Sequence, residues 1–200
     1  MTVQIKVFSD YVCPYCFLAE IPLKEAIKGK DVEVEWMPFE LRPYPNPTLK
    51  PEGTYLQEVW KDSVYPIARK LKVEINLPSI SPQPYTHLAF EGYQYAKEHY
   101  KANEYNERIL KAFFQEDQDI GQIDVLTKLA QEVGLDQAEF REALETRRYQ
   151  EVHQQALKYA YKTIQITSVP TFIIGKQILP GLPSRENLER AITIAAEVNV

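Results

Sequence analysis

Apolar and polar residues alternate in two short stretches near the start of the chain, over residues 3–7 and 32–36. A period of two is typical of a β-strand with one buried face. Between them, the apolar residues of 17–26 predict a helix, which Pro22 is expected to bend or interrupt and Gly29 to end. The pattern therefore predicts a β–α–β start.

The middle of the chain begins with a proline-rich stretch and continues with apolar residues at helical spacing. Five prolines between residues 38 and 51 predict a loop. A helical pattern over 56–71, interrupted near Pro66, is followed by a second proline-containing loop over 78–84. In the next eighty residues apolar positions recur at helical spacing, and we interpret these stripes as core. One such stripe consists of Val152, Ala156, Tyr159 and Ala160.

The last part of the chain again has a pattern typical of β-strands. Residues 171–174 and 177–179 are apolar stretches separated by a Gly175-Lys176 turn, which predicts a hairpin. Ser184 is placed to begin a final helix. The predicted order is β–α–β, a long helical block, and β–β–α.

Composition narrows the class of protein. The 200 residues are 44% hydrophobic and 26% charged, as in a folded globular domain. The net charge of −5 offers no broad basic surface for nucleic acid or an anionic membrane. With neither a secretory signal pattern nor an apolar stretch of about 20 residues, we expect a cytoplasmic protein.

The two cysteines, Cys13 and Cys16, are the strongest candidates for chemistry, because a disulfide scaffold would use more cysteines spread along the chain. If a helix begins here, Cys13 lies near its N-cap and Pro14 takes the first helical position. The amides of Tyr15 and Cys16 and the helix dipole would then stabilise a Cys13 thiolate, so we expect a lowered pKa and a solvent-open sulfur. Cys16, one turn along, could attack a mixed disulfide formed at Cys13.

Two plainer interpretations of the pair remain. The cysteines could be structural residues that fall close together by chance. They could also be half of a zinc site, but His87, His99 and His153 show no ligand spacing, so we predict no metal. Each histidine is expected at the surface or partly buried in a helix.

The segment around Val169 and Pro170 is a second candidate. Pro170 could be a proline that enters a strand, or its peptide bond could be cis and place the Val169 backbone beside the sulfurs, where a bound peptide could pair with it. The sequence alone favours the first interpretation.

Together, residues 9–16 (Ser-Asp-Tyr-Val-Cys-Pro-Tyr-Cys) and 168–174 (Ser-Val-Pro-Thr-Phe-Ile-Ile) resemble the DsbA family of the thioredoxin superfamily. The chain is most similar to the FrnE-like branch, which is related to 2-hydroxychromene-2-carboxylate isomerases and kappa-class glutathione transferases. The resemblance implies an α/β thioredoxin fold, with a central mixed sheet flanked by helices and a large all-helical insertion. Residues 1–50 and 164–200 would form the thioredoxin-like domain and residues 51–163 the insertion.

The resemblance also implies roles for individual residues. Cys13 would be the attacking cysteine and Cys16 the resolving one, with Val169 and a cis Pro170 binding substrate. Asp10 and Glu40 are candidate proton-handling carboxylates, or simply loop or strand-end residues. The dipeptide between the cysteines is Pro-Tyr, as in glutaredoxins, rather than the Pro-His of periplasmic DsbA. We therefore predict a reduction potential between roughly −120 and −270 mV.

Three functions are compared. The first is thiol–disulfide exchange on protein or small-molecule disulfides. The second is a glutathione-dependent isomerase or transferase, whose family members commonly lack the cysteine pair. The third is a non-catalytic binding module, for which the 23 aromatic residues (13 Tyr, 8 Phe and 2 Trp) would supply a surface, although core packing accounts for most of them. We expect a monomer or homodimer with no bound cofactor, no nucleic-acid or membrane partner, and glutathione as a candidate electron donor or co-substrate.

Overall fold

A four-stranded sheet lies at the centre of the molecule. In the computed structural model, which describes residues 2–198, the strands are β1 (Val3–Ser9), β2 (Val32–Pro38), β3 (Thr171–Ile174) and β4 (Gln177–Pro180). Their order is β2-β1-β3-β4, with β1 parallel to β2 and the other neighbours antiparallel. The sheet is therefore mixed. Because Ser9 pairs with Pro38, the segments that follow β1 and β2 begin side by side.

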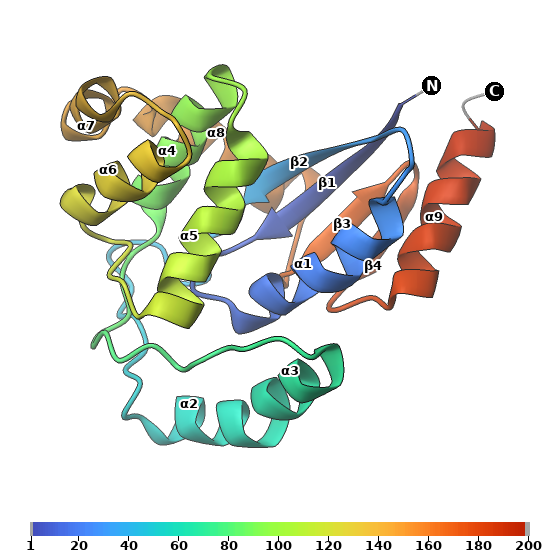
Figure 1. Ribbon diagram of the computed structural model, residues 1–200, viewed down its shortest axis with the longest axis horizontal. Helices are drawn as coiled ribbons and strands as arrows, with labels where there is room; N and C mark the ends of the chain where they lie inside the picture. Colours follow the sequence, from blue (N-terminus) through green and yellow to red (C-terminus); the bar gives the residue numbers. More distant parts are fainter. Residues whose placement is uncertain (1, 199–200) are drawn as a thin grey trace.

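Helices α1 (Pro14–Ile27) and α9 (Arg185–Val198) pack against each other on one face of the sheet (Figure 1). The predicted interruption at Pro22 is wrong, because α1 runs through this residue as one helix. Its buried face, which includes Leu18 and Leu23, packs into the core, and this outweighs the one hydrogen bond that proline cannot donate. The helix ends before Gly29, whose φ of +73° suits a glycine.

Helix α8 (Gln150–Lys158) and the π-helical segment η2 (Tyr159–Ile164) cover the opposite face. A separate apolar cluster forms there from Phe8, Met37, Phe39, Ala160 and Ile166. Of the stripe predicted here, Ala160 is buried and Tyr159 packs against the cluster, but Val152 is wrong, since it is 46% exposed whereas its neighbour His153 is buried. The inward-facing positions are those of Tyr149, His153 and Ala160.

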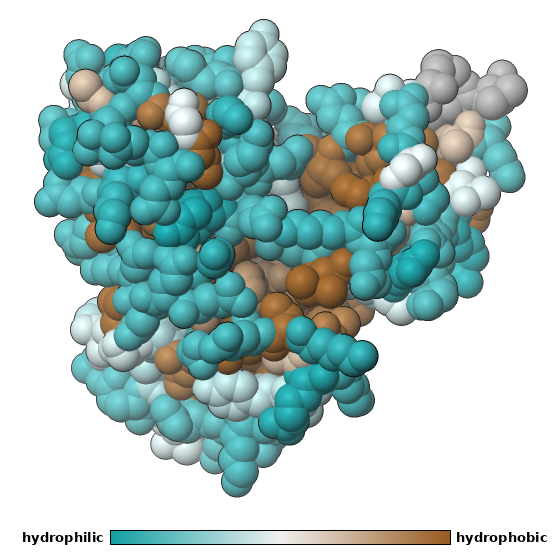
Figure 2. All heavy atoms as spheres, viewed as in Figure 1, coloured by the Kyte–Doolittle hydropathy of each residue, from teal (hydrophilic) through white to brown (hydrophobic). Residues whose placement is uncertain are grey.

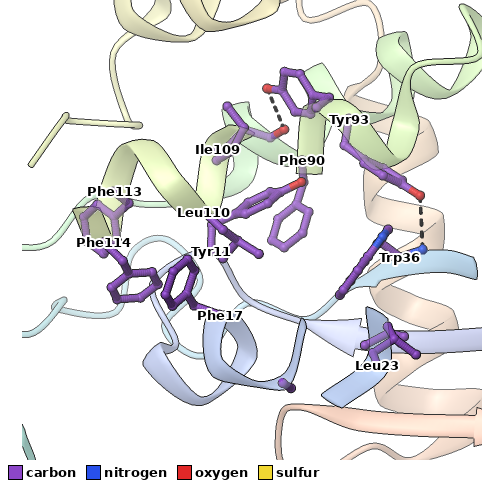
Figure 3. Packing of buried hydrophobic residues seen from close by; sticks show 14 of the residues in the cluster. Tyr11, Phe17, Leu23, Trp36, Phe90, Tyr93, Ile109, Leu110, Phe113 and Phe114 are labelled. Carbon is purple, nitrogen blue, oxygen red and sulfur yellow. Dashed lines mark hydrogen bonds between the residues drawn. The ribbon is translucent and has the colours of Figure 1, made fainter. Parts of the chain in front are cut away.

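The helical block contains α4 (His87–Glu98), α5 (Ala102–Glu116), α6 (Ile123–Glu132) and α7 (Gln137–Glu145). Figure 3 shows Phe17 of α1 close to Phe114 of α5, with Tyr11 beside them, and the ring centroids of Phe17 and Phe114 are 5.5 Å apart. On the sheet side, the Trp36 backbone N–H donates to the Tyr93 hydroxyl over 3.1 Å. The main apolar core is thus continuous between the sheet and the block. The division at residues 50/51 and 163/164 stays a prediction.

A third group of helices comprises α2 (Thr54–Val59), the π-helical segment η1 (Trp60–Val64) and α3 (Tyr65–Leu71). Pro66 lies in the first turn of α3, so the interruption predicted there takes the form of the π-helical segment. The predicted proline-rich loops are present on both sides of this group. Figure 2 shows apolar residues in the crevice between this group and the body of the molecule. Across residues 2–198, no helix has the length and apolar character needed to cross a bilayer.

Candidate active site

The two cysteines lie at the N-terminus of α1. Cys13 is the N-cap residue and Pro14 takes the first helical position, as predicted. Neither cysteine is in a disulfide, and the two come within 3.4 Å of each other. The Cys16 amide donates to the Cys13 carbonyl over 3.0 Å, and no side chain caps the helix. The predicted contact between the Cys16 amide and the Cys13 sulfur is therefore absent, because the first turn of the helix has already satisfied that amide.

Cys13 is less exposed than the sequence suggested. The residue is 4% exposed and Cys16 is 1% exposed, so a solvent-open Cys13 is not what the fold provides. The reason is that α2 and η1 lie across the start of α1 and enclose a cavity of about 270 Å³, which we call the dithiol pocket. Its walls include Cys13, Pro14, Leu56, Trp60 and Val169. Cys13 is reached by entering this pocket.

The segment before β3 closes the pocket beside Cys13. The Val169–Pro170 peptide bond is cis. The Cys13 sulfur lies 3.7 Å from the Val169 carbonyl oxygen, close enough for a weak S–H···O contact. The Pro170 carbonyl accepts a hydrogen bond from the Gly181 amide over 2.8 Å, which joins this segment to the end of β4. Val169 and Cys13, which are 156 positions apart, thus meet at one wall of the pocket.

Asp10 lies beneath the cysteines, directly after β1. It is 1% exposed, its Oδ2 accepts from the Leu41 amide over 2.7 Å, and its Oδ1 is buried without a partner. Burial raises the pKa of this carboxyl to about 7, with a smaller contribution of the same sign from the charge on Glu40. Burial also raises the pKa of the Cys16 thiol well above its usual range. The site thus combines a poorly acidic thiol behind the pocket wall with a buried carboxyl whose pKa is raised to about 7.

Glu40 is not in the dithiol pocket but behind it. It is 5% exposed, and its Oε1 lies 2.6 Å from Nε2 of His153 on α8. His153 itself is 2% exposed, so the prediction of a surface or partly buried histidine is wrong here. The sequence did contain a signal for this, because Tyr149, His153, Ala156 and Ala160 also have helical spacing.

Several polar groups of the pocket carried no sequence signal. Arg42, from the proline-rich loop, is a cation in the wall, and Gln83 and Thr86 come from the segment that leads into α4. Trp60 is buried, and its Nε1 has no hydrogen-bond partner among residues 2–198. These groups are brought together only by the tertiary placement of the two loops and η1.

The histidines do not converge on the cysteines. His99 has its Nδ1 2.8 Å from the Tyr95 carbonyl at the end of α4, and His153 is bound to Glu40. Within residues 2–198 no cluster of three or more histidine, cysteine, aspartate or glutamate side chains could hold a metal ion.

Comparison with known sequences places this chain in a protein family. The model of the DSBA-like thioredoxin domain matches residues 4–193. YwbO of Bacillus subtilis strain 168, an uncharacterised protein, is 61% identical over 194 residues, which cover 96% of this chain and 97% of the relative.

Solved structures show the same fold at low identity. The probable DsbA oxidoreductase SCO1869 of Streptomyces coelicolor has a TM-score of 0.81 at 19% identity, covering 98% of this chain and 90% of that one. A 2-hydroxychromene-2-carboxylate isomerase has a TM-score of 0.79 at 14% identity, covering 98% and 97%. The cytosolic disulfide reductase DsbM of Pseudomonas aeruginosa, solved with GSH, has a TM-score of 0.69 at 17% identity, also covering 98% and 97%. These three likenesses concern the fold alone.

Proposed function

We propose that this chain, which belongs to the family of DSBA-like thioredoxin domains, is a thiol–disulfide oxidoreductase that works through Cys13 and Cys16. The observation that carries the proposal is the pairing of two free cysteines 3.4 Å apart at a helix N-terminus, of which Cys13 lines a pocket. A helix N-terminus favours the thiolate form that disulfide exchange requires. The proposal includes a cytoplasmic location. In that reducing compartment a close cysteine pair is better suited to redox chemistry than to a structural disulfide.

The exchange proceeds in two steps. The Cys13 thiolate attacks a substrate disulfide, forming a Cys13–substrate bond and releasing one substrate thiolate. Cys16 then loses its proton and attacks the Cys13 sulfur, which closes the Cys13–Cys16 disulfide and releases the second thiolate. Two cysteine thiols are oxidised and one substrate disulfide is reduced, and the reverse sequence oxidises a substrate. Asp10 is the proposed acceptor of the Cys16 proton, because its backbone contacts Cys16 and burial raises the pKa of its carboxyl to about 7.

Val169 and Pro170 are proposed to bind the substrate. The Val169 carbonyl faces the Cys13 sulfur, so a substrate chain held at this edge would present its sulfur to the nucleophile. The unpartnered Trp60 Nε1 and the Arg42 side chain offer further polar contacts within the pocket.

The test is disulfide reduction with insulin and with a small aromatic disulfide as substrates. Cys13→Ser should abolish turnover of both, and Cys16→Ser should accumulate a mixed disulfide at Cys13 that intact-mass measurement detects. Thr193→Ser, a small change at an exposed position of α9 outside the pocket lining, serves as control. Full activity in Cys13→Ser would end the proposal.

A glutathione-dependent isomerase or transferase is the second candidate. The enclosure of Cys13 favours it, since a 4% exposed residue in a cavity of about 270 Å³ suits a small ligand. Glutathione would then bind as a co-substrate, and the Cys13–Cys16 disulfide would play no part. Glutathione-dependent isomerisation that survives Cys16→Ser would favour this candidate, and its loss would favour exchange.

A further inference from the structure

A second cavity lies behind the dithiol pocket. This rear pocket has a volume of about 460 Å³, and its walls include Glu40, Tyr44, His87, Glu91, Arg147 and His153. The two pockets have no lining residue in common. Successive residues of one short segment divide between them, because Leu41 and Arg42 line the dithiol pocket whereas Glu40 and Pro43 line the rear pocket. The segment 40–43 is therefore a partition between the two cavities.

Asp10 and Glu40 lie on the two sides of this partition. Both follow paired strands, and the Phe39 amide continues the pairing by donating to the Ser9 carbonyl over 3.0 Å. One residue after Glu40, the Leu41 amide holds Asp10 Oδ2. The two buried carboxyls are thus tied together by the backbone of one short segment, and a charge on Glu40 acts on Asp10 through a protein interior that screens it poorly.

His153 fixes the side chain of Glu40. Its ring stacks on Phe90, with centroids 5.5 Å apart and planes 13° apart, which sets the direction in which Nε2 points. A carboxylate can only accept, so Nε2 carries the proton of the 2.6 Å bond to Glu40. The other ring nitrogen, Nδ1, is buried without a partner. Tyr161 holds the main chain at the same point, because its hydroxyl donates to the Glu40 carbonyl over 2.7 Å.

We propose that His153 is a positioning residue for the dithiol site: it holds the Glu40 carboxylate behind Asp10, where its charge makes the Asp10 carboxylate a better acceptor for the proton that Cys16 releases. The inference rests on the proposed function, since the proton in question is the one that Cys16 releases when it attacks the Cys13–substrate disulfide. That proton passes to the Asp10 carboxylate, the Cys13–Cys16 bond forms, and the departing substrate thiolate takes a proton from water. The rear pocket is the opening through which solvent reaches the Glu40–His153 pair.

The other charged groups around the pair do not supply this control. Arg147 binds Glu91 in a bidentate contact, with Nε 2.9 Å from Oε2 and Nη2 2.6 Å from Oε1, so its charge interacts mainly with Glu91 and less with Glu40. Burial lowers the pKa of His87, which disfavours its charged form. The remaining neighbours are hydroxyl, thiol or amide groups, namely Tyr161, Thr86, Cys16 and the Leu41 amide. The charge that acts on Asp10 from behind the partition is therefore that of Glu40, which His153 holds in place.

The experiment is an NMR titration of the Asp10 side-chain carboxyl carbon in the full reduced chain, with the signal assigned by its loss in Asp10→Asn. Glu40→Gln removes the charge, and His153→Leu removes the hydrogen bond that holds this charge behind Asp10. In both variants the midpoint should fall by about one pH unit, the lower end of the effect of a close charge. His153→Gln retains a donor and should leave the midpoint unchanged, as should the control His99→Gln at the C-cap of α4. The double variant Glu40→Gln/His153→Leu should move it no further than either single change.

The rate at which Cys16 resolves a mixed disulfide gives the second reading. The acidic limb of the pH–rate profile should move to lower pH in Glu40→Gln and His153→Leu. The size of this move should equal the shift of the Asp10 midpoint in the NMR titration. An Asp10 midpoint that stays in place in Glu40→Gln would overturn the inference, whatever the fate of His153→Leu. If the Asp10 midpoint moves but the pH dependence of the resolution rate does not, the positioning role is overturned. A wild-type chain that exchanges no disulfide would instead refute the proposed function, while the titration would still decide whether the pair acts on Asp10.

Discussion

Replacing Asp10 with asparagine should change the way in which the stability of the protein depends on pH. The folded protein holds the Asp10 proton up to about pH 7, because burial raises the pKa from 3.8. Between these two values the folded state binds one proton more than the unfolded chain, so the free energy of unfolding falls as pH rises. The rise of about three pH units corresponds to about 4 kcal/mol in total, at 1.36 kcal/mol per unit. Above about pH 7 this contribution is lost.

Asp10→Asn removes this proton and with it the corresponding slope. The measurement is urea unfolding of the reduced protein at several values from about pH 4 to about pH 8. The difference in free energy of unfolding between variant and wild type should shift in favour of the variant by a few kcal/mol, up to about 4, across this range. Asp62→Asn, an Asp-to-Asn change at an exposed position of η1, is the matched control and should keep the wild-type slope. An Asp10→Asn protein whose stability follows the wild-type curve in parallel would refute the assignment of a buried, protonated Asp10.

Three further substitutions have expected outcomes that the same unfolding measurement checks. Glu20, whose pKa burial raises to about 7, should contribute a second slope of the same sign as Asp10, so Glu20→Gln should flatten the curve further and the effects of the two changes should add. Arg147→Gln leaves the fully buried Glu91 without its partner and should cost about 3–5 kcal/mol; adding Glu91→Gln should recover much of this loss, and a failure to do so would show that Arg147 acts otherwise. Gly92→Ala places a methyl group against the Tyr105 hydroxyl and 2.7 Å from Phe140 Cζ, so it should destabilise by about 1–3 kcal/mol, whereas Gln94→Ala on the same helix should have little effect.

Local patterns predicted most elements of the fold. The alternation over residues 3–7 and the turn at Gly175-Lys176 are set by neighbours in sequence, and both elements are present where the pattern predicted them. Asp136 caps α7 through a local contact of the same kind, because it accepts from the Glu139 amide over 2.8 Å. The errors occur where tertiary packing outweighs a local rule. Helix α1 tolerates Pro22 because its neighbours are buried, and α8 turns a histidine inward because Glu40 provides a partner.

The candidate site was predictable only in part. The spacing of Cys13 and Cys16 sets their place on α1, so the sequence was sufficient for the pair. The enclosure of Cys13 depends on where η1 lies, and the Glu40–His153 contact joins residues 113 positions apart. No local pattern encodes either of these contacts. The role of the dipeptide in the reduction potential stays a prediction.

The central claim, that Cys13 and Cys16 form one exchanging dithiol, is tested most directly by equilibrating the protein in glutathione buffers of graded potential. Free thiols are then alkylated and counted by intact mass. Both thiols should disappear together, as a single Cys13–Cys16 disulfide, with a midpoint between roughly −120 and −270 mV. A chain that keeps two free thiols, or carries only a glutathione adduct at Cys13, across the whole range would contradict the claim.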